Sequence, residues 1–342
     1  MSNQTTYKLP FTILAIALVV SFIGNISLGS VAIPISSVFK SLFTSIDNQS
    51  WQYIILNYRL PKAITAILVG SGLGISGLLM QTLFRNPLAG PFVLGISSGA
   101  SLGVAVVILG AGIFGGNLAM MLLSRWSIVL AASLGSFLVL LSVLAVSIKV
   151  RDTMAILIIG LMFGSITAAI VSVLSYFSSA EQLQQYIFWG FGSLGNLSWN
   201  ELLIFSCIYI FGLFLSIASI KALNTLLLGE NYAKSLGLNI NQSRLIIIIA
   251  TSLLAGTITA FAGPIAFIGL AIPHMVRQVF NTANHKTLLP AVFLFGAIVM
   301  LICDSIAQLP TSNYTLPINA ITSLIGAPVV IWLLVRKRKM LF

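Results

Sequence analysis

Long apolar segments recur along the whole chain, separated by short stretches rich in Gly, Pro and Asn. Because a helix needs about 20 apolar residues to cross the hydrocarbon core of a bilayer, segments of this length predict membrane-spanning helices. We therefore predict an all-α fold, a polytopic membrane protein with about ten transmembrane helices. The segments lie near residues 11–29, 63–83, 92–113, 128–147, 154–177, 202–220, 245–262, 265–280, 288–306 and 318–335.

The eighth segment is shorter than the others and follows Gly263-Pro264. A Gly-Pro pair interrupts a helix, because proline lacks the backbone donor and restricts the preceding residue. We expect a broken or partly re-entrant pair of helices here. Such backbone is stable at membrane depth only where protein or water covers it.

The composition supports this fold class. Hydrophobic residues make up 58% of the 342 residues and charged residues only 7%, against roughly 25% charged in ordinary globular domains. A water-soluble domain with one core is excluded. We predict a single transmembrane domain over residues 1–342, with an N-terminal segment retained as the first helix rather than removed as a signal peptide.

We attribute the net charge of +11 to the membrane topology and not to a nucleic-acid-binding site, because Lys and Arg concentrate in loops that stay cytoplasmic. With ten crossings, 13 of the 17 basic residues fall on the side of the N-terminus. The other four are Lys40, Arg59, Lys62 and Arg125. This bias predicts cytoplasmic N- and C-termini.

Motifs of catalysis and nucleotide binding are missing from the sequence. There is no GxxxxGK[ST] loop, no Ser/His/acid set and no cluster of metal ligands, so we predict no enzyme activity and no cofactor on this chain. The glycines of residues 72–77 match GxGxxG, but they lie inside an apolar segment with no preceding strand. Any ATP and Mg²⁺ would be bound by a separate subunit.

Small residues repeat at four-residue spacing at Gly70 and Gly74, and again at Gly95, Gly99 and Gly103. In lipid this spacing lets helix backbones approach closely. Close helix packing is the favoured interpretation, and a small face that lines a translocation path is the alternative. Asp304, an acid inside the ninth segment, is interpreted as a partner for a helix end or a nearby basic group.

The longest loop on the predicted inner side covers residues 221–244. Its pattern predicts a short helix from Glu230 to Leu236, ended by Gly237 as a C-cap. Residues 181–199 on the other side carry several aromatic residues, which is typical of a helix at the headgroup level.

Several strings in a fixed order carry a resemblance to a known family. They are RLPK at residues 59–62, the glycine-rich stretch 68–101, LLGENYAKSLGLN at 227–239, GPIAFIGLAIPHMVR at 263–277, HK at 285–286 with LLP at 288–290, and LPINAITSLIGAP at 316–328. Over nearly its whole length the chain resembles the FecCD family, the membrane subunits of ABC importers for vitamin B12, iron-siderophores and haem.

The resemblance implies a vitamin-B12-permease-like fold with ten helices in each subunit, located in the inner membrane of a bacterium. It further implies a second permease subunit, with a homodimer expected, together with two ATPase subunits and a substrate-binding protein. The 221–244 loop is then the cytoplasmic coupling loop that seats in the ATPase. The implied ATPase-coupling residues are Gly229, Glu230, Ala233, Leu236 and Gly237.

The resemblance also implies two further sites. Asn86 and Leu88 match the inner constriction of the family, and Thr153 with Met154 matches the second part of this gate, where Met154 replaces a small polar residue. Arg59 and Lys62 match basic positions that meet acidic residues of the binding protein, while a third such position is Gln308 here.

The resulting prediction is a permease subunit of an ATP-driven importer that provides the path for an iron-siderophore complex, with haem and cobalamin as close alternatives. An ion-coupled secondary transporter is the first alternative of another class, and a passive channel is the second. The scarcity of ionisable residues inside the segments argues against coupling to an ion gradient.

Overall fold

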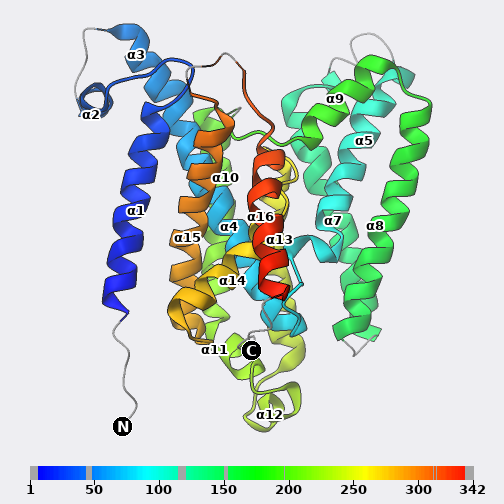
Figure 1. The fold of residues 1–342 in the computed structure, drawn as a ribbon. Helices are drawn as coiled ribbons and strands as arrows, with labels where there is room; N and C mark the ends of the chain where they lie inside the picture. The colour runs from blue at the N-terminus through cyan, green and yellow to red at the C-terminus, as the bar shows by residue number, and fades with distance from the viewer. Residues whose placement is uncertain are drawn as a thin grey trace. The chain divides into compact units, whose positions relative to one another are not determined.

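A computed structural model describes residues 7–43, 48–114, 121–149, 153–195, 197–310, 312 and 314–335. Every regular element among these residues is a helix, which confirms the predicted fold class (Figure 1). By contacts the chain divides into two compact units. The long helices α4 (Leu60–Phe84) and α10 (Trp199–Ala218) each contribute to both units.

The first unit contains residues 1–78, 194–206 and 266–342. Besides the first parts of α4 and α10, its elements are α1 (Lys8–Ser27), α2 (Ile35–Phe43), α3 (Gln49–Ile54), the π-helical turn η1 (Ile55–Arg59), α14 (Ile268–Phe280), α15 (His285–Ala307) and α16 (Ile318–Val335). Helix α1 packs along α15, and α15 packs against α14 and α16. The rings of Tyr7 and Phe11 lie 5.6 and 4.9 Å from the ring of Phe280 and fix the start of α1 against the end of α14.

The second unit contains residues 79–193 and 207–265. Besides the later parts of α4 and α10, its elements are the 3₁₀ turn η2 (Pro91–Leu94), α5 (Ile96–Phe114), α7 (Arg125–Lys149), α8 (Thr153–Tyr176), α9 (Ala180–Gly190), α11 (Ile220–Leu226), α12 (Glu230–Ser235) and α13 (Ile240–Ala262). Helix α5 packs against α7 and α8, and α13 packs against α7. Small side chains such as Ala100, Val104 and Ala132 form the core where α5 meets α7.

Glycines permit the closest helix contacts in both units. In the first unit, a Cβ added at Gly70 would lie 2.2 Å from the carbonyl oxygen of Gly296, and one at Gly77 only 1.5 Å from that of Gly269. In the second unit, a Cβ at Gly99 would lie 2.5 Å from the carbonyl oxygen of Gly135. These contacts support the interpretation of the glycine spacing as close helix packing.

All ten predicted segments coincide with helices, although their boundaries shift. Seven helices in the described part of the chain are long and apolar enough to cross a membrane, and residues Ile96–Ala111 and Ile318–Trp332 form shorter apolar helices. The eighth segment is α14, with 13 residues and hence a length of only about 20 Å. The predicted break is confirmed, because α13 ends at Ala262 and α14 begins at Ile268, while the partly re-entrant path stays a prediction.

The second predicted span, near residues 63–83, corresponds to α4 (Leu60–Phe84), but the helix does not begin there. Helical structure is continuous from Gln49 to Phe84, over 36 residues, because η1 adds a π-turn that carries α3 directly into α4. Asn48 caps this helix by accepting a hydrogen bond from the Trp51 backbone amide at 3.2 Å. Arg59 and Lys62 therefore lie on a continuous helix.

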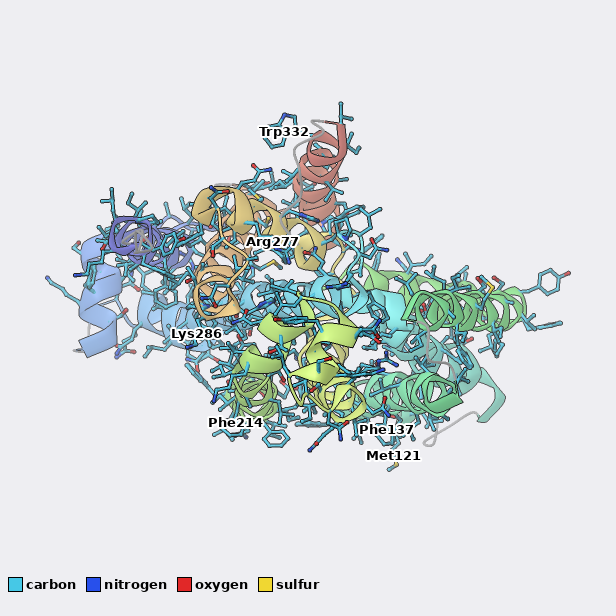
Figure 2. All side chains as sticks on the ribbon, turned by 90° about the horizontal axis from the view of Figure 1, so that it is seen from below. Met121, Phe137, Phe214, Arg277, Lys286 and Trp332 are labelled. Atoms are coloured by element: carbon cyan, nitrogen blue, oxygen red, sulfur yellow. The ribbon has the colours of Figure 1, made fainter. Side chains whose placement is uncertain are left out.

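Large apolar side chains remain on the outside of several helices. In α1 and α8 only 17% of the most apolar window is buried, and Figure 2 shows Phe137 of α7 and Phe214 of α10 directed away from their helices, with 51% and 63% exposure. Water-soluble monomers rarely expose contiguous apolar surface of this extent. Lipid hydrocarbon is the environment that suits these faces.

Candidate functional site

The 221–244 loop folds into two short helices, α11 and α12, at one end of the second unit (Figure 1). Gly229 precedes α12 with φ of +107°, and Gly237 follows it with φ of +83°, values that favour glycine. The Gly237 amide donates to the carbonyl of Lys234 at 2.9 Å. The predicted short helix and its glycine C-cap are confirmed, with the helix ending at Ser235.

The two faces of α12 differ in burial. Ala233 is fully buried, whereas Leu228, Tyr232 and Leu236 are 57–59% exposed. Tyr232 in α12 and Leu236 at its C-cap are four positions apart and share one side of the helical turn, while Leu228 lies in the turn before Gly229. We call these three residues the apolar stripe of α12. All three are exposed, and Tyr232 is of a residue type enriched in binding hot spots.

An ion pair holds α12 against the start of α13. The Arg244 guanidinium lies 3.2 Å from the Glu230 carboxylate, and the Arg244 side chain is only 10% exposed. Glu230 is the first residue of α12, where a carboxylate also interacts favourably with the helix dipole. The predicted coupling residue Glu230 therefore orients α12 on the second unit.

The predicted gate residues Asn86 and Leu88 lie in a tight turn after α4. The Asn86 side-chain oxygen accepts a hydrogen bond from the Leu88 amide at 2.9 Å, and the Asn86 carbonyl accepts one from the Ala89 amide at 3.1 Å. The Leu88 side chain is 45% exposed. Asn86 thus fixes the turn, which we call the 86–90 turn, while Leu88 projects from it.

The other two predicted gate residues begin α8, not the preceding loop. Helix α8 starts at Thr153, so Thr153 and Met154 occupy its first positions. Their side chains lie outside the described part of the structure, and their role in the gate stays a prediction.

Arg59 has several partners within the first unit. Its guanidinium donates to the carbonyl oxygens of Ile26 at 2.7 Å and Ser27 at 2.9 Å, and also to that of Val31. The side chain is buried, and it satisfies carbonyls at the C-terminal end of α1, where cations are favoured. The structure thus shows Arg59 as a cap for α1. The docking role of Arg59 stays a prediction.

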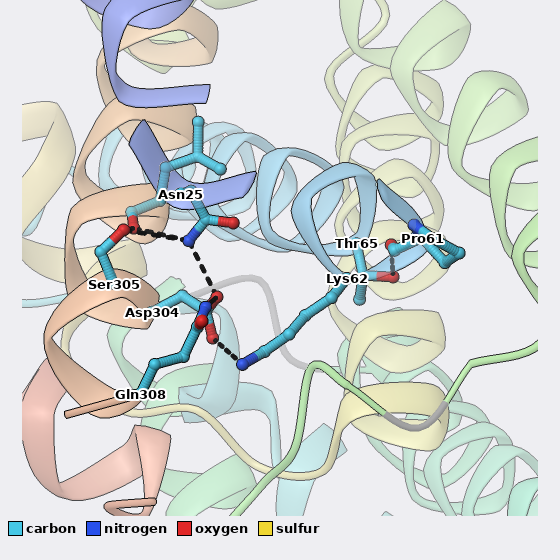
Figure 3. Close-up of polar contacts among 8 residues, drawn as sticks. Asn25, Pro61, Lys62, Thr65, Asp304, Ser305 and Gln308 are labelled. Atoms are coloured by element: carbon cyan, nitrogen blue, oxygen red, sulfur yellow. Dashed lines mark hydrogen bonds and ion pairs between the residues drawn. The ribbon is translucent and has the colours of Figure 1, made fainter. Parts of the chain in front are cut away.

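Lys62 belongs to a buried polar cluster centred on Asp304 (Figure 3). The Lys62 ammonium lies 3.0 Å from the Asp304 carboxylate, which also accepts hydrogen bonds from Asn25 at 2.9 Å and Gln308 at 2.7 Å. Asp304 is 2% exposed, whereas the Lys62 side chain is 22% exposed. The interpretation of Asp304 as the partner of a basic group is confirmed.

We call Asn25, Lys62, Asp304 and Gln308 the Asp304 cluster. It joins α1, α4 and α15, because each of these helices contributes at least one member. Sequence reasoning missed Asn25, a lone amide near the end of an apolar helix. The sequence feature that could have revealed Asn25 is that it is a polar residue in an otherwise apolar segment. A polar group at membrane depth requires a partner. Within the described residues, no group of three or more His, Cys, Asp or Glu residues could hold a metal ion.

The architecture defines a polytopic helical membrane protein with a short, glycine-bounded helix in a polar loop. The model of the FecCD transport family matches residues 16–336. The chain therefore belongs to the FecCD transport family, which confirms the family that the sequence motifs indicated.

Two curated relatives illustrate this membership. The hemin transport system permease protein HmuU of Yersinia pestis is 34% identical over 340 residues, with 99% of each chain covered. The vitamin B12 import system permease protein BtuC of Klebsiella pneumoniae subsp. pneumoniae is 38% identical over 288 residues, with 84% of each chain covered.

The fold is similar to that of a solved structure described as an inward-facing conformation of a metal-chelate type ABC transporter. The TM-score is 0.83 at 31% sequence identity, and the match covers 97% of this chain and 100% of the other. The chain is thus a multi-pass membrane permease of the ABC importer type. No finding favours an ion-coupled secondary transporter.

Proposed function

We propose that this chain forms the translocation path of an ATP-driven importer for large metal chelates, with an iron-siderophore complex as cargo. Its partners are a second copy of the chain, two ATPase subunits and a substrate-binding protein. Both termini and the 221–244 loop face the cytoplasm of a bacterial cell. The match to a permease family over residues 16–336 supports the transport role, and the names of the relatives support cargo of the haem, vitamin B12 or metal-chelate class.

The observation that carries the ATPase partnership is the apolar stripe of α12. Leu228, Tyr232 and Leu236 are exposed in and beside the short helix α12, and the protein core does not cover them. Such a surface suits a hydrophobic groove on another protein, in the helix-in-groove mode. The Glu230–Arg244 ion pair beneath it gives this surface a fixed orientation.

Transport in vesicles tests the proposal. Permease reconstituted with its ATPase and binding protein is expected to import radioactive iron-siderophore when ATP is supplied, and to import nothing when the permease stands alone under a proton or sodium gradient. Haem and cobalamin are offered in parallel. Uptake driven by an ion gradient without the ATPase would overturn the proposal, and ATP-driven uptake of haem or cobalamin alone would change only the cargo.

A charge within the apolar stripe is expected to prevent ATPase association. In Tyr232→Asp, a carboxylate enters an apolar contact and an aromatic anchor is lost, so binding should weaken at least about tenfold. Co-purification of the ATPase with tagged permease measures this. Asn231→Asp is the matched control, because it adds the same charge to α12 beside the stripe. Equal ATPase recovery with Tyr232→Asp and wild type would exclude the stripe as the docking surface.

A further inference from the structure

The end of α4 is bonded to the 221–244 loop, although 141 residues separate the two bonded positions. The Arg85 guanidinium donates to the Leu226 carbonyl at 3.0 Å and to the Leu227 carbonyl at 2.6 Å. Both carbonyls lie at the C-terminal end of α11, and all three residues belong to the second unit. Neither the motif of the 86–90 turn nor that of the loop predicted this contact.

The charge of Arg85 makes these two hydrogen bonds stronger than hydrogen bonds between neutral groups. The last carbonyls of a helix have no partner within the helix, and a cation is favoured there by the helix dipole. Hydrogen bonds with a charged donor are roughly twice as strong as neutral ones. A single nitrogen of the Arg85 guanidinium, Nη2, donates both of them here.

The backbone on each side of the contact is constrained. Arg85 itself adopts a left-handed conformation, with φ of +48°, which is unusual for a residue with a long side chain. This conformation turns the chain from α4 into the 86–90 turn, where the Asn86 amide donates to the Gln81 carbonyl at 3.2 Å. The Arg85 side chain is therefore joined to the 86–90 turn by the restricted backbone of Arg85 itself.

On the loop side, the contact lies beside the glycine that begins α12. A Cβ added at Gly229 would lie 3.6 Å from the Arg85 guanidinium, so Arg85 lies beside the glycine that separates α11 from α12. Glu230 follows at once and is paired with Arg244. Gly229 and Leu228 are therefore the only residues between the carbonyls bonded to Arg85 and the first residue of α12.

From this geometry we propose that Arg85 is a positioning residue that links the 221–244 loop to the 86–90 turn. It transmits the movement of α12 to Asn86 and Leu88 through its two hydrogen bonds to the end of α11. This inference rests on the proposed function, because it requires that an ATPase moves α12. It adds that Arg85, which belongs to neither the predicted gate nor the predicted coupling residues, connects these two sites.

The test compares Arg85→Gln, Arg85→Lys and the control Lys221→Gln in the reconstituted importer. Lys221 is an exposed basic residue at the start of the same loop, so its replacement removes an equal charge. We measure ATP hydrolysed per cargo molecule imported. Arg85→Gln is expected to raise this ratio at least about tenfold, since two charge-assisted bonds are lost. Arg85→Lys should give an intermediate ratio, and Lys221→Gln the wild-type ratio.

A second measurement does not require transport. Spin labels at positions 88 and 228, both exposed in the wild type, report the distance between the turn and the loop after Cys207 and Cys303 have been replaced. The distance distribution should broaden in Arg85→Gln and stay narrow in Lys221→Gln. An unchanged distribution together with an unchanged ATP ratio would overturn the link while the importer itself works. A wild-type importer without ATP-driven uptake would instead overturn the proposed function and this inference with it.

Discussion

Gly77→Ala is expected to prevent the permease from folding into a stable, monodisperse protein. The added methyl group would lie 1.5 Å from the carbonyl oxygen of Gly269, so α4 and α14 would have to separate by about 2 Å to reach ordinary contact distance. The atom in the way is backbone and cannot rotate aside. We expect a loss of stability at or above the ~3 kcal/mol upper end of typical overpacking costs.

Size-exclusion profiles and thermal midpoints in detergent measure this effect. Gly24→Ala is the matched control: Gly24 lies in α1 of the same unit, and a Cβ there would meet nothing within 4 Å. The control should be neutral or slightly stabilising, because alanine favours a helix by about 1 kcal/mol over glycine. A Gly77→Ala protein with the wild-type midpoint would show that the α4–α14 contact is not as close as the structure has it.

The position of Gly77 also explains the GxGxxG match of residues 72–77. Gly74 faces Val292 and Ile272, and Gly77 faces Gly269, so these two glycines serve helix packing within the first unit. The same spacing that lets a backbone approach a pyrophosphate also lets it approach another helix. An apolar setting without a preceding strand is what distinguishes the two cases in the sequence.

Hydropathy predicted the helices because the bilayer requires long apolar segments, whatever the helices contact. It could not predict how each helix is rotated, and therefore not the partners of its polar residues. Asn25 and Asp304 are 279 positions apart, and Arg85 and Leu226 are 141 apart. Lone polar residues at membrane depth indicate that a partner exists, but only packing decides which one it is.

Backbone conformations that oppose the local sequence preference set a second limit on what could be predicted. Phe267 precedes α14 with φ of +64°, a conformation in which a glycine or asparagine would be expected rather than an aromatic residue. Its side chain lies against Gly326 of α16, within the first unit. The tertiary contact thus overrides the local preference. By contrast, Gly229 and Gly237 have positive φ values, and the short helix between them was predictable.

Asp304→Ala is expected to destabilise the first unit by about 3 kcal/mol, within the range for breaking a buried ion pair. Lys62 loses its counter-ion, and Asn25 and Gln308 lose an acceptor. The exposed part of Lys62 limits the cost, because its ammonium can turn toward water. The thermal midpoint of Asp304→Ala measures this loss, and the free energies of unfolding of Asp304→Asn, Lys62→Met and their double variant give the coupling energy of the pair. Additive effects would exclude a stabilising Lys62–Asp304 interaction.

The same variants separate this structural role of Lys62 from the predicted docking role. If the Lys62 ammonium meets a carboxylate of the binding protein, it must be shared with Asp304 or released from it. Lys62→Met should then weaken docking and reduce its salt dependence, since rim charges act mainly on association, whereas Asp304→Asn should strengthen docking by freeing the ammonium. If Lys62 only stabilises the Asp304 cluster, both variants should change docking in the same direction, and binding assays at low and high salt distinguish the two outcomes.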